Sequence, residues 1–159
     1  AEAVPARPGL RDFDRPLTPR GCSQAQQAAR LLQQLGVQPD AIVASPAVRA
    51  RATAAIVAAQ LGYPREVDQQ PALYQAAAQA LLAALQRCEA GAQTVLLVAH
   101  NPGLSELVQG LAGAHAARPD ERDQRITLAT GALCRIELDG RPWSALQPDA
   151  VTALDLPGG

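Results

Sequence analysis

The chain has 159 residues, with 14 basic and 15 acidic side chains and a formal net charge of -1. This length fits one domain with a substantial core, and the charge balance gives no general attraction to nucleic acid or to an anionic membrane. Because no apolar run approaches the roughly 18 to 20 residues of a transmembrane helix and no signal-peptide core is present, we expect a cytoplasmic protein without nucleic-acid or membrane partners.

Cysteine and histidine usage argues against a bound metal or a disulfide framework. Cys22, Cys88 and Cys134 lie far apart and never in C-x-x-C spacing, which indicates reduced thiols. His100 and His115 are the only two histidines in the sequence, too few for a histidine-rich metal centre. We therefore expect neither a metal nor another cofactor.

Residues 1–17 contain three prolines and one glycine without a periodic apolar pattern, which predicts an irregular loop. The loop carries Arg7, Arg11 and Arg15, and long loops in compact domains are commonly functional. Thr18 and Pro19 then open a helix that Gly36 closes. We expect its core face to consist of Ala25, Ala28, Ala29, Leu32 and Leu35.

The next segment of the sequence predicts a buried strand followed by a helix. Residues 41–44, A-I-V-A, form the strand, and Ser45-Pro46 opens a helix that ends near Gly62. Spacing suggests that this helix packs through Val48, Ala52, Ile56 and Ala59. Arg49 and Arg51 fall in its first two turns, where a cation opposes the helix macrodipole unless an anion binds there.

The same pattern returns further along the chain. After a weak strand candidate at 65–70 and a helix at 74–88, residues 95–99 form an apolar run typical of a strand buried on both faces. His100 follows the strand directly, and Asn101 and Pro102 suit the cap and first turn of the next helix. Residues 114–123, which include His115, read as a polar loop. An alternating strand at 133–138 turns at Asp139-Gly140 toward residues 143–146.

Alternating strands and helices predict an α/β fold of three layers, with a mostly parallel sheet, helices on both faces and an antiparallel hairpin at one edge. No repeat or linker divides residues 1–159, so we expect a single domain. The junctions at Ser45 and at His100 should then lie together at the carboxyl edge of the sheet, where ligands usually bind.

The two junctions offer helix N-termini, which bind phosphate through free backbone N–H groups. Arg49 could add a bidentate guanidinium contact, and protonated His100 could donate to a phosphoryl oxygen. A cysteine-based phosphatase is excluded, because no cysteine is followed by arginine six residues later. Asp12 and Asp14 follow no buried strand and read as a solvated loop pair, and the P-loop and nucleophile-elbow motifs are absent.

Three motifs resemble the histidine phosphatase superfamily, and within it the bacterial phosphohistidine phosphatases of the SixA type. They are L-T-P-R-G at 17–21, S-P-A-V-R-A-R-A-T at 45–53 and V-L-L-V-A-H-N-P at 95–102, with T-G-A-L-C-R-I-E-L at 130–138 fitting as well. The resemblance implies a phosphoglycerate mutase-like fold and dephosphorylation of protein phosphohistidine through a phosphohistidine enzyme intermediate.

The resemblance also implies roles for individual residues. Arg49 resembles the second phosphate-binding arginine and His100 the second active-site histidine, both catalytic, while Arg15 is a weaker match to an arginine near the phosphate. Ser45 and Asn101, at the two junctions, complete the predicted phosphate-binding set. The implied partner is a phosphorylated protein or a small phosphorylated molecule, and we expect a monomer.

One part of the family pattern is missing from the sequence. The family signature begins with a strand that ends in Arg-His, whereas A-E-A at residues 1–3 looks like the continuation of an R-H-A-E-A motif. The nucleophilic histidine, one phosphate arginine and the first strand are therefore expected to be absent from residues 1–159, which should be catalytically impaired alone. His115 is not expected to replace the nucleophile. Two alternatives remain: a phosphatase of a small metabolite, and a non-catalytic phosphate-binding regulatory domain.

Overall fold

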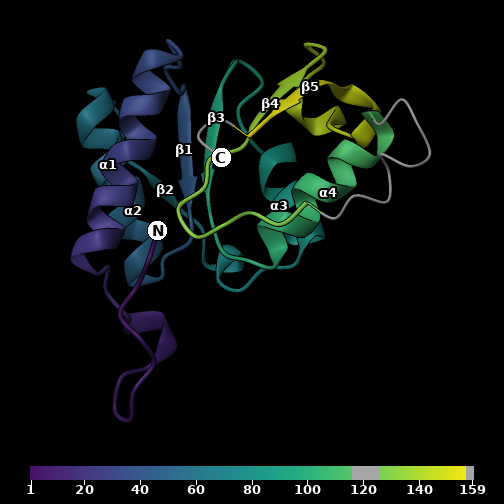
Figure 1. Ribbon diagram of the computed structural model, residues 1–159. Coiled ribbons are helices and arrows are strands. Elements are labelled where there is room, and N and C mark those ends of the chain that lie inside the picture. The colour runs from purple at the N-terminus through teal and green to yellow at the C-terminus, as the bar shows by residue number, and fades with distance from the viewer. Residues whose placement is uncertain (116–125, 157–159) are drawn as a thin grey trace.

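The computed structural model describes residues 1–115 and 126–156 (Figure 1). Its central sheet has three parallel strands in the order β2-β1-β3, formed by Asp68–Gln69, Ala41–Ala44 and Val95–Val98. In the register, Ala44 pairs with Val98 and with Gln69. The apolar runs at 41–44 and 95–98 thus form neighbouring strands that end at the same edge.

Helices cover both faces of this sheet (Figure 1). One layer holds α1 (Pro19–Gln34) and α2 (Val48–Leu61), which pack against each other; the other holds α3 (Ala78–Gln86) and α4 (Gly103–His115). The predicted three-layer α/β architecture is therefore confirmed. Among the residues that the structure describes, no helix has the length and hydropathy needed to cross a bilayer.

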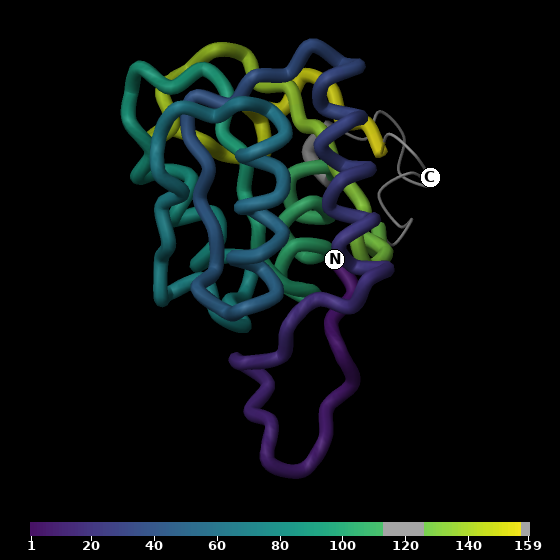
Figure 2. Tube along the Cα trace, turned by 90° about the vertical axis from the view of Figure 1, so that its left-hand side faces the viewer, coloured from purple at the N-terminus to yellow at the C-terminus, as the bar shows by residue number. Residues whose placement is uncertain are grey.

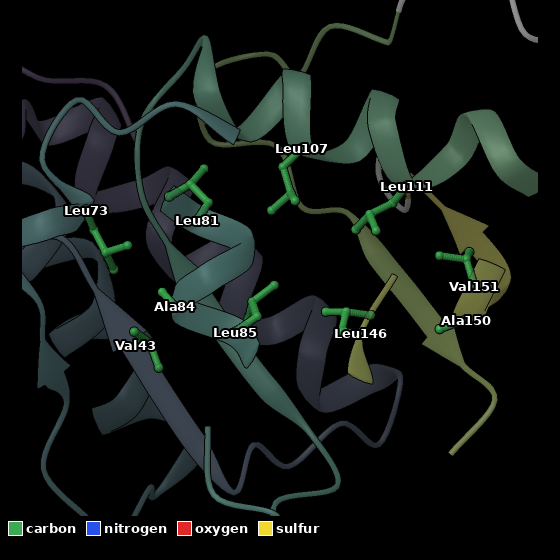
Figure 3. Close-up of a cluster of buried hydrophobic side chains, with 10 residues drawn as sticks. All are labelled: Val43, Leu73, Leu81, Ala84, Leu85, Leu107, Leu111, Leu146, Ala150 and Val151. Atoms are coloured by element: carbon green, nitrogen blue, oxygen red, sulfur yellow. The ribbon is translucent and has the colours of Figure 1, made fainter. Parts of the chain in front are cut away.

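Three apolar clusters hold the layers together, and one of them, Ile42, Ala44 and Ala54, joins β1 to α2. The largest lies between β1, α3, α4 and the C-terminal segment, and Figure 3 shows its buried members, which are Val43, Leu73, Leu81, Ala84, Leu85, Leu107, Leu111, Leu146, Ala150 and Val151. The third joins α1 to α2 through Ala29, Leu32, Val57 and Leu61. Each fully buried leucine contributes about 1.5–3 kcal/mol of transfer free energy, so these clusters fix the helices that carry the site residues.

The C-terminal hairpin differs from the prediction. Strand β4 (Arg135–Leu138) pairs antiparallel with β5 (Val151–Asp155), and this pair is a separate two-stranded sheet, not an edge of the parallel one. The predicted partner at 143–146 instead contains a 3-10 helix, Trp143–Ala145, whose Trp143 Nε1 donates to the Ala92 carbonyl at 2.6 Å. Pro142 and Pro148 lack the N–H that a ladder requires, so the chain pairs only beyond them.

Some helix faces and boundaries also differ from the prediction. The buried side of α2 is formed by Ala50, Ala54, Val57 and Leu61, not by the predicted set, because α2 is apolar on most of its circumference. Leu35, assigned to the core, is 38% exposed and follows the end of α1. Helix α3 begins at Ala78, since Gln75 has a left-handed φ of 50°. Of the loop predicted at 114–123, Ala114 and His115 belong to α4, and residues 116–125 lie outside the described residues.

The N-terminal segment protrudes from one end of the domain, as Figure 2 shows. It is largely irregular, as predicted, with isolated bridges between Ala3 and Leu17 and between Arg7 and Leu10 and one 3-10 turn, Asp12–Asp14. Its base is anchored on α1: Thr18 N donates to the Glu2 carbonyl at 3.1 Å, and Glu2 N donates to Gln24 Oε1 at 2.7 Å. The loop therefore leaves and returns at a fixed point beside the sheet edge.

Candidate active site

The two strand-to-helix junctions meet, as the sequence predicted. His100 follows β3 and Ser45 follows β1, and His100 Nε2 lies 2.7 Å from Ser45 Oγ. Ser45 is fully buried, and its backbone N donates to the Val98 carbonyl at 2.9 Å. The parallel register of β1 and β3 thus places the imidazole at the carboxyl edge of the sheet, the usual ligand-binding edge of an α/β fold.

Arg49, in the first turn of α2, extends from the neighbouring junction into the same region. Its side chain is 13% exposed, and its two terminal nitrogens donate to Asp12: Nη1 to the carbonyl at 2.6 Å and Nη2 to Oδ2 at 2.9 Å. Arg51, two residues later, is exposed. Of the two arginines predicted at this helix start, Arg49 is the one that lies beside His100 in a shared cavity.

Arg15 reaches this cavity from the N-terminal loop. Its Nε and Nη2 donate to Asp12 Oδ1 at 2.9 and 2.7 Å, and its Nη1 donates to the Val4 carbonyl at 2.7 Å. Asp12 therefore lies between the two guanidinium groups. A direct contact of Arg15 with phosphate stays a prediction, since its observed hydrogen bonds go to the loop itself.

The turn before α3 supplies an aromatic wall and a second hydroxyl. Tyr74 OH donates to Asp12 Oδ2 at 2.9 Å, and the Tyr74 ring meets the His100 ring edge to face, with centroids 5.8 Å apart. Gly103, at the start of α4, lies against the same turn, because a Cβ there would lie 2.0 Å from the Ala76 carbonyl oxygen. The glycine lets the turn at 74–77 pack against the helix that follows His100.

Electrostatics at the site keep the imidazole neutral and the aspartate charged. Burial, followed by the nearby charge of Arg49, lowers the pKa of His100 to about 4, although the Asp12 charge acts in the opposite direction. For Asp12, partial desolvation would raise the pKa, but hydrogen bonds from Arg15, Tyr74 and Arg49 hold it well below its usual value. Near neutral pH the site therefore has an uncharged histidine beside an arginine–aspartate cluster.

A cavity of about 550 Å³ lies next to these residues. Asp12, Arg15, Arg49 and His100 line its polar end, and helices α1 and α2 together with residues 96–99 and 128–133 line the rest. All four residues of β3 are only half-buried, although the sequence predicted burial on both faces. The difference arises because one edge of β3 pairs with β1, whereas the other borders this cavity.

The remaining predicted residues have structural partners. Asn101 Oδ1 accepts from the backbone N–H of Ser105 in the first turn of α4 at 3.3 Å, but the helix begins at Gly103, so Pro102 and not Asn101 directly precedes it. Asn101 Nδ2 donates to the Leu128 carbonyl at 2.6 Å. Ser45 contacts the His100 ring through its hydroxyl. His115 is the last residue of α4, about 18 Å along the helix from Gly103. Direct phosphate contacts of Ser45 and Asn101 stay predictions.

Asp12 is the site residue that sequence reasoning missed. Its side chain is 37% exposed and that of Asp14 is 35% exposed, so the two differ in their partners and not in their solvation. Asp14 pairs with the exposed Arg11, whereas Asp12 pairs with both Arg15 and Arg49. The spacing D-F-D-R, with Arg15 three residues after Asp12, could have suggested the local ion pair. Within the described residues, no group of three or more His, Cys, Asp or Glu side chains is placed to hold a metal ion.

Comparison with protein families gives a match to the histidine phosphatase superfamily (branch 1) over residues 9–77. That region contains Arg15, Ser45 and Arg49, which the fold brings to one edge. A solved structure of a putative phosphohistidine phosphatase SixA from Nakamurella multipartitia superposes with a TM-score of 0.76 and 25% identity, covering 100% of this chain and 92% of that one. Residues 9–77 therefore belong to the histidine phosphatase superfamily, and the fold of the whole chain matches that of the SixA structure.

Other SixA structures resemble this chain as well. A putative phosphohistidine phosphatase SixA from Agrobacterium tumefaciens gives a TM-score of 0.74 at 26% identity, covering 87% of this chain and 86% of that one. A protein histidine phosphatase SixA complexed with tungstate gives 0.71 at 26% identity, covering 87% and 84%. The fold of this chain is therefore SixA-like.

Two curated relatives of this chain are uncharacterized proteins. One, from Picosynechococcus sp., is 40% identical over 107 residues, which cover 64% of this chain and 62% of the relative. The chain thus spans about three fifths of that relative's length. The other, from Mycobacterium tuberculosis, is 29% identical over 143 residues, covering 88% and 86%.

Proposed function

We propose that this domain is a phosphohistidine phosphatase of the SixA type, acting on phosphohistidine in a protein through a phosphohistidine enzyme intermediate. The observation that carries the proposal is the convergence of Arg49 and His100 on one cavity at the carboxyl edge of a SixA-like sheet. A guanidinium group neutralises phosphoryl oxygens, and an imidazole N–H adds a directed donor for the charge of the transition state.

The protonation states at the site support a substrate with a good leaving group. Asp12 stays ionised and His100 is neutral near pH 7, so neither is a ready proton donor. An alkoxide leaving from a sugar phosphate needs such a donor. Phosphohistidine does not, because a ring that is already protonated leaves as neutral imidazole, whose conjugate acid has a pKa near 6.5. This chemistry favours protein phosphohistidine over a small phosphate ester.

The proposed nucleophile is a histidine outside residues 1–159. His100 is already bonded to Ser45 through Nε2, and His115 stands at the far end of α4 from the site. We propose that an extended segment preceding Ala1 lies along the free edge of β3 and brings the nucleophile beside Arg49. Two observations support this placement: Ala1 lines the cavity with β3, and Glu2 is held against α1 by its backbone bonds to Gln24 and Thr18.

In the proposed reaction, the incoming histidine nitrogen attacks phosphorus as the substrate P–N bond breaks and neutral imidazole leaves. Water then attacks the enzyme phosphohistidine, and the second P–N bond breaks to release inorganic phosphate. Arg49 would bind the equatorial oxygens in both steps, and His100 would donate one hydrogen bond to them. Both residues act by positioning and charge stabilisation, which dominate catalysis of phosphoryl transfer.

The test compares residues 1–159 with the full gene product that contains them. We expect the full product to release phosphate from a phosphohistidine protein, and His100→Ala and Arg49→Ala to reduce that rate strongly. Residues 1–159 alone should bind tungstate or inorganic phosphate without turnover. Turnover by residues 1–159 that His100→Ala abolishes would contradict the external nucleophile.

The same assay separates the alternative functions. Faster turnover of a small sugar phosphate than of the phosphoprotein would favour a metabolite phosphatase. Oxyanion binding by the full gene product without turnover of either substrate would favour a non-catalytic phosphate-binding domain.

A further inference from the structure

We propose that Asp12 is a positioning residue of the phosphate site: its carboxylate fixes the guanidinium groups of Arg49 and Arg15 and sets the charge beside His100. The inference rests on the proposed function only in taking the Arg49 and His100 cavity as the phosphate site.

The contacts of Asp12 connect three segments of the chain. Oδ1 accepts from Arg15 in its own loop at 2.9 and 2.7 Å, and Oδ2 accepts from Arg49 in α2 and from Tyr74 OH before α3, each at 2.9 Å. Gln75 Nε2 adds a longer contact of 3.4 Å to Oδ2. An aspartate that only anchored its own loop would not need partners 37 and 62 residues away in sequence.

The geometry at Arg49 leaves donors for a ligand. A guanidinium group carries five N–H bonds in a rigid plane, and Asp12 takes one from each terminal nitrogen, through its carbonyl and its carboxylate. Three N–H bonds of Arg49 therefore remain for phosphoryl oxygens, held in a fixed plane at a side chain that is largely buried. Without Asp12, several rotamers of this long side chain would become accessible, and orientation would be lost.

The charges around Asp12 also support a positioning role. Asp12 stands between two cations that would otherwise repel each other, and it leaves the cluster with one net positive charge. Burial and the charge of Arg49 lower the pKa of His100, whereas the charge of Asp12 raises it. Asp12 thus limits how far the arginine charge suppresses protonation of His100.

Asp14 provides a matched control. It lies two residues away in the same 3-10 turn and carries the same charge, but its side chain pairs with the exposed Arg11 instead of the site arginines. A general effect of removing one negative charge from the loop should appear in both Asp12→Asn and Asp14→Asn. A positioning effect should appear only in Asp12→Asn.

The first experiment measures steady-state kinetics of the full gene product on a phosphohistidine protein. We expect Asp12→Asn to lower kcat by at least about tenfold with KM changed less than about threefold, since misorientation costs most in the transition state. Asp14→Asn should match the parent. Added to Arg49→Gln, the Asp12→Asn change should cost less activity than it costs alone, because Asp12 acts in part through Arg49 and in part through Arg15. Unchanged kcat, or fully additive losses, would overturn the inference.

The second experiment needs no turnover and uses residues 1–159. NMR titration of the His100 ring should give a lower pKa in Asp12→Asn than in the parent, and an unchanged pKa in Asp14→Asn. If the gene product shows no turnover but this shift occurs, the proposed function fails while the positioning role stands. An unshifted His100, or equal shifts in both variants, would overturn the positioning role.

A variant that removes only one contact covers the case in which Asp12→Asn does not fold. Tyr74→Phe deletes the hydroxyl that donates to Asp12 Oδ2 and keeps the aromatic ring against His100. We expect a fall in kcat in the same direction as Asp12→Asn but smaller, with KM unchanged. Parental kcat in Tyr74→Phe, together with an unfolded Asp12→Asn, would assign Asp12 a structural role and overturn the inference.

Discussion

His100 and Ser45 are 55 residues apart in sequence, yet His100 Nε2 and Ser45 Oγ lie 2.7 Å apart. The register of the sheet accounts for this, because Ala44 and Val98 are direct partners and each residue named here lies just beyond its strand. Ser45 is fully buried, so it has no alternative partner in solvent. The hydrogen bond between the hydroxyl and Nε2 thus fixes the orientation of the imidazole ring. The other ring nitrogen, Nδ1, is not bonded to Ser45.

Ser45→Ala should therefore reduce catalysis more than its small change in volume suggests. Removing the hydroxyl leaves His100 Nε2 without its buried partner, at a cost of about 1–3 kcal/mol, and lets the ring rotate. We expect a lower free energy of unfolding in urea and at least about a tenfold lower kcat. Ser23→Ala is the control, because the Ser23 hydroxyl bonds the Pro19 carbonyl on an exposed turn of α1. Parental kcat in Ser45→Ala would contradict the orienting role.

The meeting of the two junctions could be predicted from sequence because it depends on local signals. Each junction is a short apolar run, a polar residue and a proline, and the carboxyl ends of parallel strands always share an edge. The order of strands and helices followed from the same periodicity. Strand-to-helix spacing alone thus located Ser45, Arg49 and His100.

The features that the sequence analysis did not predict depend on contacts between segments far apart in the sequence. Asp12 lies in a loop without periodicity, and its partners Arg49 and Tyr74 come from segments that local patterns cannot connect to it. Helix α2 is apolar almost all round, so its buried face could not be assigned by spacing.

Arg49→Gln should weaken the binding of inorganic phosphate to residues 1–159. A hydrogen bond between charged groups contributes about 1.5–3 kcal/mol, which corresponds to about a ten- to hundredfold change in affinity. Titration calorimetry with phosphate checks this directly, at fixed ionic strength. Arg51→Gln on the same helix is the control for net charge, since Arg51 is exposed. Equal losses in both variants would mean that the site responds only to overall charge.

Stability should depend on pH through His100. Burial and Arg49 lower its pKa from 6.5 to about 4 in the folded protein, so the unfolded chain binds the proton first as the pH falls. The folded state therefore loses stability between pH 6.5 and about 4. Urea unfolding at several pH values should show a steeper loss in the parent than in His100→Gln. Identical slopes in the two proteins would contradict the lowered pKa of His100.

Gly103 and Gly110, both in α4, should respond oppositely to alanine. At Gly103 a Cβ would lie 2.0 Å from the Ala76 carbonyl oxygen, whereas at Gly110 it would meet nothing within 4 Å. Gly110→Ala should stabilise the protein by about 0.5–1 kcal/mol through helix propensity, while Gly103→Ala should destabilise it by about 1–3 kcal/mol through overpacking. Urea unfolding measures both changes.

The same pair tests how the turn at 74–77 supports the site. Displacing Ala76 would move Tyr74 away from the ring of His100 and from Asp12, so Gly103→Ala should also lower kcat of the full gene product. Gly110→Ala, seven residues along the helix, should leave kcat unchanged. Normal kcat in a stable Gly103→Ala protein would show that the helix start tolerates a Cβ without moving the turn, and that the close approach does not set the position of Tyr74.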